Sequence, residues 1–132
     1  MIQHEYLVVT ETYATYRPVG ETTRQQAIEI VALAIAHARE QNIAHLLIDT
    51  TRLTGFAAPN TLERFSLGSL FARSAQGTVK VAFVAKAEMI DPQKFGLMVA
   101  RNRGMTAEVF TDEAATLVWL LQGVSGDEST SS

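Results

Sequence analysis

The stretch that decides the fold is His45-Leu46-Leu47-Ile48-Asp49-Thr50-Thr51-Arg52-Leu53-Thr54-Gly55-Phe56. Its apolar residues form a continuous run that ends on Asp49, without the polar alternation of a strand that faces water. Such a run is typical of a strand buried on both faces, as in the interior of a parallel sheet. Two hydroxyls, a base and a glycine follow, and they predict a loop that leads into a helix.

Strands and helices alternate on both sides of this stretch. Segments rich in β-branched and aromatic residues predict further strands at 6–10, 14–18, 78–85 and 106–110. Capping residues and apolar periodicity predict helices over about 22–41, 60–77, 91–104 and 111–121. The expected cap pairs are Thr22 with Gln25 and Asn60 with Glu63, and Asp91 is expected to cap a helix that starts on Pro92.

The order β-β-α-β-α-β-α-β-α predicts a single α/β domain over residues 1–122. Strands that alternate with helices form a mainly parallel sheet through right-handed crossovers, so only the N-terminal edge is expected to be antiparallel. We expect one sheet layer of about four or five strands, flanked by about four helices. Residues 123–132 are rich in Gly, Ser, Thr and acids and are expected to form a disordered tail.

The spacing of apolar residues predicts which face of each helix is buried. In the first helix a wide apolar arc includes Ile30 and leaves Leu33 among polar side chains, which suggests cover by a neighbouring helix or a second subunit. Ile30 and Leu33 are therefore the residues expected to mediate self-association. The later helices are expected to bury Leu62, Phe65, Leu70 and Phe71, then Phe95, Met98 and Val99, then Leu117, Val118, Leu120 and Leu121.

Composition argues against several classes of function. The formal net charge of −3 provides no basic surface for nucleic acid. The absence of cysteine rules out disulfides, cysteine-bound metals and thiol catalysis. His4, His37 and His45 do not form a metal-ligand pattern, and no cofactor motif is present. Because no signal peptide and no membrane-inserting stretch is visible, we expect a cytoplasmic protein.

The order and spacing of several segments match a known family. The segments are Leu46-Leu47-Ile48-Asp49 with its loop to a capped helix, Lys80-Val81-Ala82-Phe83-Val84, Ala107-Glu108-Val109-Phe110 followed by Thr111-Asp112-Glu113, and Trp119-Leu120. Together with Gly20 ahead of the first helix, they resemble the STAS-like domains, specifically the SpoIIAA-like branch, over most of residues 5–121. The resemblance implies a sheet flanked by helices and a non-enzymatic role in binding proteins or small ligands.

The resemblance also implies a place for a phosphorylation switch. In anti-sigma-factor antagonists, a serine at the start of the helix after the central strand is phosphorylated. Here Ala57 and Ala58 stand where hydroxyl residues are expected, and Thr61 is the nearest acceptor. The sequence therefore departs from the family at this point, and Thr61 is only a weak candidate for modification.

Polar residues after two of the expected strands suggest a ligand site. Ligands of open α/β sheets bind beyond the carboxyl ends of the strands. Asp49, Thr50, Thr51 and Arg52 follow one strand, Lys86 follows another, and the helix that begins at Asn60 offers free backbone N–H groups. The alternative is that Asp49 and the threonines satisfy loop backbone groups while Arg52 pairs with a nearby acid.

These observations lead to three functional hypotheses. The first is a regulatory STAS-like domain that acts through an unidentified protein partner or as a homodimer. The alternative is a carrier or sensor for a small hydrophobic or anionic ligand. An enzyme that uses Asp49 or Glu88 is the weakest, because no third group is visible to orient either carboxylate, so no catalytic residue is predicted.

Overall fold

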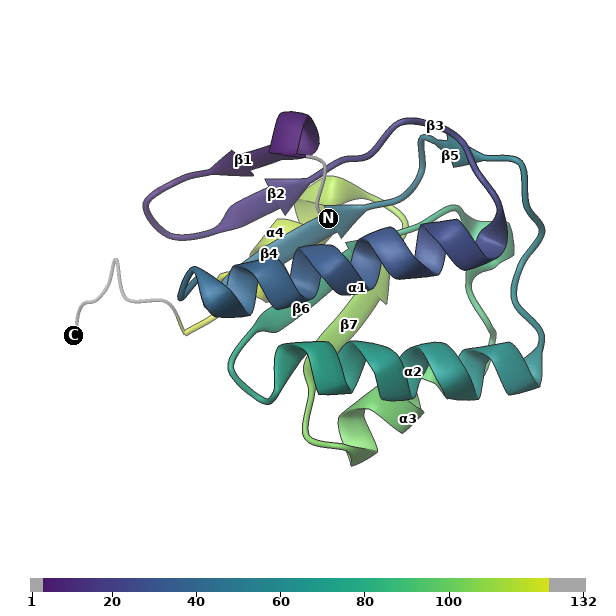
Figure 1. The fold of residues 1–132 in the computed structure, drawn as a ribbon. Helices are drawn as coiled ribbons and strands as arrows, with labels where there is room; N and C mark the ends of the chain where they lie inside the picture. Colours follow the sequence, from purple (N-terminus) through teal and green to yellow (C-terminus); the bar gives the residue numbers. More distant parts are fainter. Residues whose placement is uncertain (1–3, 124–132) are drawn as a thin grey trace.

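A five-stranded sheet forms the centre of the computed structural model, which describes residues 4–123 (Figure 1). The strand order is β1 (Leu7–Val9), β2 (Ala14–Tyr16), β4 (His45–Asp49), β6 (Lys80–Val84) and β7 (Thr106–Phe110). Only β1 is antiparallel to its neighbour, and the other pairs are parallel. The apolar strand β4 lies in the middle of the sheet, as the sequence predicts.

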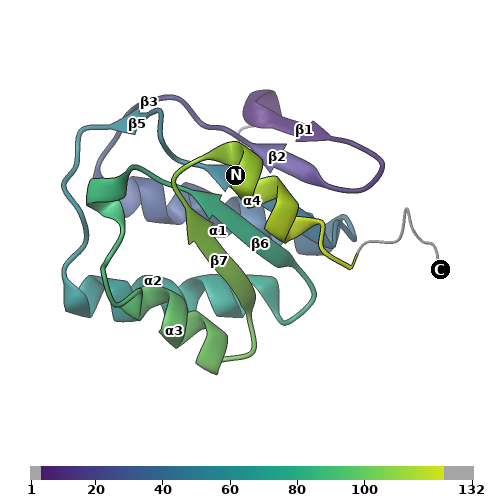
Figure 2. The same ribbon diagram turned by 180° about the vertical axis from the view of Figure 1, so that it is seen from behind.

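Helices cover both faces of the sheet. Helices α1 (Arg24–Glu40), α2 (Thr61–Ala75) and α3 (Phe95–Asn102) lie on one side, and α4 (Glu113–Leu120) lies across the opposite face (Figure 2). Short 3-10 turns occur at η1 (His4–Tyr6) and η2 (Ala87–Met89). The predicted mixed α/β fold with a mainly parallel sheet and four helices is confirmed.

A second, small sheet lies beyond the carboxyl end of β4. Strands β3 (Gly20–Glu21) and β5 (Leu53–Thr54) pair in parallel, a feature that the sequence does not predict. Gly55 follows with φ +100°, and an added Cβ would lie 2.7 Å from the Thr22 carbonyl oxygen. The loop after β4 is therefore fastened to the segment that enters α1.

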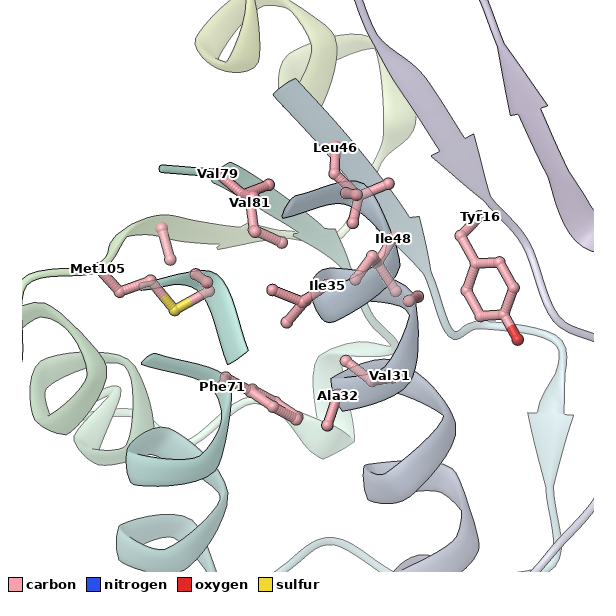
Figure 3. Close-up of a cluster of buried hydrophobic side chains, with 14 of the residues drawn as sticks. Tyr16, Val31, Ala32, Ile35, Leu46, Ile48, Phe71, Val79, Val81 and Met105 are labelled. Carbon is pink, nitrogen blue, oxygen red and sulfur yellow. The ribbon is translucent and has the colours of Figure 1, made fainter. Parts of the chain in front are cut away.

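Two apolar cores form on the two faces of the sheet. The larger joins Tyr16, Ile48 and Val81 of the sheet to Ile35 of α1 and Phe71 of α2 (Figure 3). The smaller packs Leu120 of α4 against Leu47, Ala82 and Val84. Because side chains alternate along a strand, Leu46 and Ile48 face α1 and α2 while Leu47 faces α4.

The wide apolar arc of α1 is explained within one chain. Val31 and Ile35 belong to the core that also holds Phe71 and Ala72 of the neighbouring helix α2. Leu33 is 39% exposed and Ile30 is half-buried. The arc therefore does not require a second subunit, and α2 provides the cover that the sequence left open.

Helix starts match the sequence in one case and differ in two. Asn60 and Glu63 form the predicted reciprocal capping box of α2. The capping box of α1 is Thr23 with Gln26, one residue later than predicted. The prediction that a helix starts at Asp91 and Pro92 is wrong, because the Asp91 carboxylate closes a turn by accepting from Phe95 N–H at 2.7 Å and α3 begins there.

Four apolar residues expected inside are exposed. Leu62 is 75% exposed because it lies about 180° around α2 from buried Phe71. Phe65 is 43% exposed beside Arg103, and Met98 lies off the buried face of the short helix α3. Val118 is 67% exposed, about 200° around α4 from the buried Thr116 and Leu120. Past Gly123, the tail expected to be disordered lies outside the described residues.

Candidate functional site

A cavity of about 190 Å³ lies between the sheet and helices α1, α2 and α3. Its apolar wall includes Ile28 and Val31 of α1, Phe71 of α2 and Leu97 of α3, and Met105 just before β7. Val31, Phe71 and Met105 also belong to the larger core (Figure 3), so the core forms part of the cavity wall. Its outer wall comes from the loop after β4 and from η2.

Small residues create this space. Ala27, Ala100 and Ala107 line the cavity from α1, α3 and β7, and none of them has a side chain long enough to fill it. The rings of Phe71 and Phe83 stack with centroids 5.8 Å apart and close one side. Protein interiors are otherwise packed to nearly crystalline density, so a space of this size is a structural feature to be explained.

The rim of the cavity is basic. Arg24, Arg64, Lys86 and Lys94 contribute to its lining, with Asp91 as the acid among the lining residues. Within residues 4–123, two of the four cations pair with carboxylates and two do not. The distinction decides which of them can serve an incoming ligand.

Arg24 forms an ion pair with Glu63 that links two helices. It donates through Nε and Nη2 to Glu63 Oε2 at 3.0 and 2.9 Å, and its Nη1 donates to the Ala57 carbonyl oxygen at 3.2 Å. The backbone hydrogen bond from Asn60 to Glu63, together with Arg24, lowers the pKa of Glu63. The bridge ties the start of α1 to the start of α2 and to the loop that precedes α2.

Lys94 likewise forms an ion pair, with Glu108. Its ammonium lies 3.1 Å from Glu108 Oε1, and Arg101 approaches the other Glu108 oxygen at 2.9 Å. Burial alone would raise the pKa of Glu108, but the hydrogen bond from its neighbour Val109 and the two cations lower it. Lys94 also adopts a left-handed backbone with φ 52°, a strained conformation for a residue with a side chain.

Arg64 and Lys86 have no carboxylate partner among the described residues. Arg64 donates only to the Met89 carbonyl oxygen, at 3.4 and 3.5 Å. Lys86 Nζ lies 3.5 Å from the Leu53 carbonyl oxygen. Charge-assisted hydrogen bonds in proteins are normally about 2.7–2.9 Å long, so both cations are weakly satisfied.

The residues predicted to bind a ligand do not all meet at one site. Thr50 and Lys86 line the cavity, as expected for residues beyond the ends of β4 and β6. Arg52 is exposed and does not line it. Asn60 is occupied as the α2 cap, where its side chain accepts from Glu63 N–H at 2.8 Å, and Thr61 is exposed on the first turn.

Asp49 and Thr51 belong to a different polar cluster. Asp49 is 7% exposed and shares the face of Leu47, toward α4. Its Oδ1 accepts from the Thr51 backbone N–H at 2.9 Å and from the Thr51 hydroxyl at 2.6 Å. Nearby, Arg17 donates to Glu113, which raises the pKa of Arg17. The cluster joins the end of β4, the residue after β2 and the start of α4. Glu88 is exposed on η2, so Asp49 and Glu88, the two acids considered for catalysis, lie in different surroundings.

Sequence reasoning missed Arg64, Met89 at the end of η2, and Ile90 directly after it. Arg64 occupies the helical position three residues before Leu67 and seven before Phe71, which both line the cavity. A basic residue on the inward stripe of an amphipathic helix is the signal that could have revealed it. No comparable signal marks Met89 and Ile90, because η2 is a single turn inside an expected loop.

Titratable clusters elsewhere are sparse in residues 4–123. No group of three or more His, Asp or Glu side chains in that range is placed to hold a metal ion. His45 lies at the opposite end of β4 from the cavity, where burial and the neighbouring Lys80 lower its pKa. None of the helices in the described part of the chain is long and apolar enough to cross a membrane.

Comparisons with known proteins concern the fold alone. No family model matches the chain, and no curated protein matches it. The chain is similar to the crystal structure of an uncharacterised protein from the DUF3478 family with a SpoIIAA-like fold, from Shewanella loihica PV-4. The two are 19% identical, with 86% of this chain and 90% of that chain covered and a TM-score of 0.46.

Proposed function

We propose that this chain is a non-enzymatic binding protein that holds a small apolar molecule in the cavity between the sheet and helices α1, α2 and α3. The single observation that carries the proposal is the cavity of about 190 Å³ lined by Ile28, Val31, Phe71 and Leu97. A carrier or a sensor would both use such a site. The proposal follows the ligand-binding alternative drawn from the sequence and relocates its centre from Asp49 to this cavity.

The size and the wall of the cavity support binding of an apolar group. An engineered apolar cavity of about 150 Å³ stays dry and binds benzene, so a space of this order accepts a ring or a short chain. Burial of apolar ligand surface stabilises a complex by about 25 cal/mol per Å² removed from water. The cavity also lies next to the carboxyl ends of parallel strands, where open α/β sheets bind their ligands.

Narrowing the cavity is expected to weaken ligand binding. We expect octan-1-ol, a neutral probe, to shift the NMR signals of Val31, Phe71 and Met105 in a saturable titration. Ala85→Leu adds bulk to a half-buried residue of the wall and is expected to weaken this binding about tenfold or more, because steric exclusion costs on the order of 1–3 kcal/mol.

A matched control comes from the same segment. Ala87 is exposed and does not line the cavity, so Ala87→Leu adds the same side chain without narrowing the site. We expect its dissociation constant for octan-1-ol to equal that of the unmodified protein. Equal binding by Ala85→Leu and Ala87→Leu, or no saturable shift with any protein, would contradict the proposal.

A second candidate function is protein interaction, which the sequence placed first. A groove between α1 and α2 is lined by Ile28, Leu62, Leu67 and Leu70, and Leu62 is 75% exposed at its edge. Leu62 adjoins the half-buried Ile28, Leu67 and Leu70, and a contiguous apolar surface is a feature of sites that bind other proteins. By contrast, Ile30 and Leu33, the residues predicted for self-association, do not line the groove.

Substitutions can distinguish self-association through the groove between α1 and α2 from self-association through the α1 face that carries Ile30 and Leu33. If copies associate through the groove, we expect Leu62→Glu to shift a dimer to monomer in sedimentation velocity, because the new charge loses its water at the interface. If they associate through the face predicted from the sequence, Leu33→Glu should do so instead. A monomer at millimolar concentration before any substitution would rule out both.

A further inference from the structure

We infer that the ligand of this cavity is an amphipathic monoanion, a carboxylic acid with a short apolar chain or ring whose carboxylate binds to Arg64 and Lys86. The inference rests on the proposed function and names the chemical class of its ligand. Four observations carry it: the two cations that lack a carboxylate partner in the described part of the chain, the one acid among the lining residues, the size of the cavity and its apolar wall.

The first argument is the contrast among the four cations of the rim. Arg24 pairs with Glu63 at 2.9 Å and also contacts the loop before α2. Lys94, directly before α3, pairs with Glu108 at 3.1 Å. Arg64 and Lys86 are also half-buried, yet among residues 4–123 their side chains reach carbonyl oxygens alone, at 3.4–3.5 Å. Partial removal of a charge from water costs free energy unless an opposite charge compensates for it. An anion at the rim provides that compensation.

The two free cations approach the same short turn. Lys86 precedes η2 as its N-cap residue, and the Arg64 guanidinium reaches the carbonyl oxygen of Met89 at the end of η2. Lys86 Nζ extends from there to Leu53 on β5. Because both residues line the same cavity, a head group inside it can be met from α2 by Arg64 and from the end of β6 by Lys86. A guanidinium matches the two oxygens of a carboxylate with two parallel hydrogen bonds.

The charge of the rim indicates one negative charge on the ligand. After the Arg24 and Lys94 pairs are set aside, Arg64, Lys86 and Asp91 remain in the lining. Two cations and one carboxylate leave a single net positive charge. Asp91 is fixed by its hydrogen bond to Phe95 N–H and would repel a second negative charge. A monoanionic carboxylate is therefore favoured over a dianionic phosphate ester.

The volume of the cavity limits the size of the apolar part of the ligand. A cavity of about 150 Å³ holds one benzene ring, so a cavity of about 190 Å³ holds one ring or a chain of about six to eight carbon atoms. Longer chains would have to leave through the rim into water. Octanoate and 3-phenylpropanoate are therefore suitable probes.

The test compares ligands that differ only in the head group. Dissociation constants of octanoate, octan-1-ol and octyl phosphate are measured by NMR titration on the full chain at pH 7. We expect octanoate to bind about tenfold to a hundredfold more tightly than octan-1-ol, as hydrogen bonds to charged groups imply. Octyl phosphate is expected to bind more weakly than octanoate, and stronger binding would overturn the carboxylate assignment.

Variants of the two cations locate the head group. Arg64→Gln and Lys86→Gln are each expected to remove most of the preference for octanoate and to leave octan-1-ol binding unchanged, which shows that the cavity is intact. Arg73→Gln provides the matched control, because Arg73 is exposed on the same helix and does not line the cavity. It should keep the full preference.

The outcomes separate the inference from the proposed function. If octanoate and octan-1-ol bind equally, or if Arg64→Gln and Lys86→Gln both keep the preference, the head-group inference is wrong while the cavity still binds apolar molecules. If octanoate, 3-phenylpropanoate and octan-1-ol all fail to bind, the proposed function is wrong and the inference falls with it.

Discussion

Leu120→Ala is expected to lower the free energy of unfolding by about 2–5 kcal/mol, the range measured for large-to-small substitutions in protein cores. Leu120 is fully buried and belongs to the core formed by Leu47, Ala82 and Val84 on the α4 face of the sheet. This core is small, so few neighbours can move into the space that the leucine leaves. Chemical denaturation monitored by circular dichroism measures the change.

Val118→Ala provides the control for Leu120→Ala. Val118 lies two residues away on the same helix and is 67% exposed. Its substitution is expected to change the free energy of unfolding by less than about 0.5 kcal/mol, as for other surface positions. Similar losses in the two variants would mean that α4 is docked on the sheet through a different face.

The sequence predicts the layers of this fold more reliably than the rotation of its helices. The continuous apolar run of β4 and the alternation of strands with helices are strong signals, because burial on both faces removes polar residues from a central strand. Helix α4 offers no such signal, because apolar residues surround most of its circumference: Leu117, Val118, Trp119, Leu120 and Leu121. Which of them faces the sheet depends on how the helix docks, and Val118 was assigned to the wrong side.

The lining of the candidate cavity follows from the sequence only in part, for a similar reason. The rule that ligands bind beyond the ends of parallel strands identifies Thr50 and Lys86, which line the cavity. Asp49 follows the same strand, but strand alternation turns it toward α4, together with Leu47. Arg64 comes from a helix that reaches the cavity through tertiary packing alone, so no motif in the sequence links it to Lys86.

Helix α2, which carries Arg64, is held in position by close packing against α3. Gly68 of α2 faces Gly96 of α3 with no room for a side chain: an added Cβ would fall well inside van der Waals contact with the Gly96 carbonyl oxygen and would lie 3.1 Å from Val99 Cβ. The obstructing atom is backbone, so the two helices must separate to accept it. Gly96 and Leu97 of α3 line the cavity, and Arg64 and Leu67 line it from α2. The helix contact and the cavity therefore depend on the same spacing.

Gly68→Ala is expected to lower the free energy of unfolding by about 1–3 kcal/mol, the usual cost of overpacking, even though alanine is the better helix former by about 1 kcal/mol. Denaturation with urea measures this loss, and Ser66→Ala, an exposed change on the same helix, should leave stability within about 0.5 kcal/mol of the unmodified protein. Because separation of the helices also moves the wall of the cavity, we expect Gly68→Ala to weaken octan-1-ol binding in the folded fraction. A stabilised Gly68→Ala variant with unchanged binding would show that α2 and α3 are not held at this distance, and the cavity would lose the frame that gives it a defined volume.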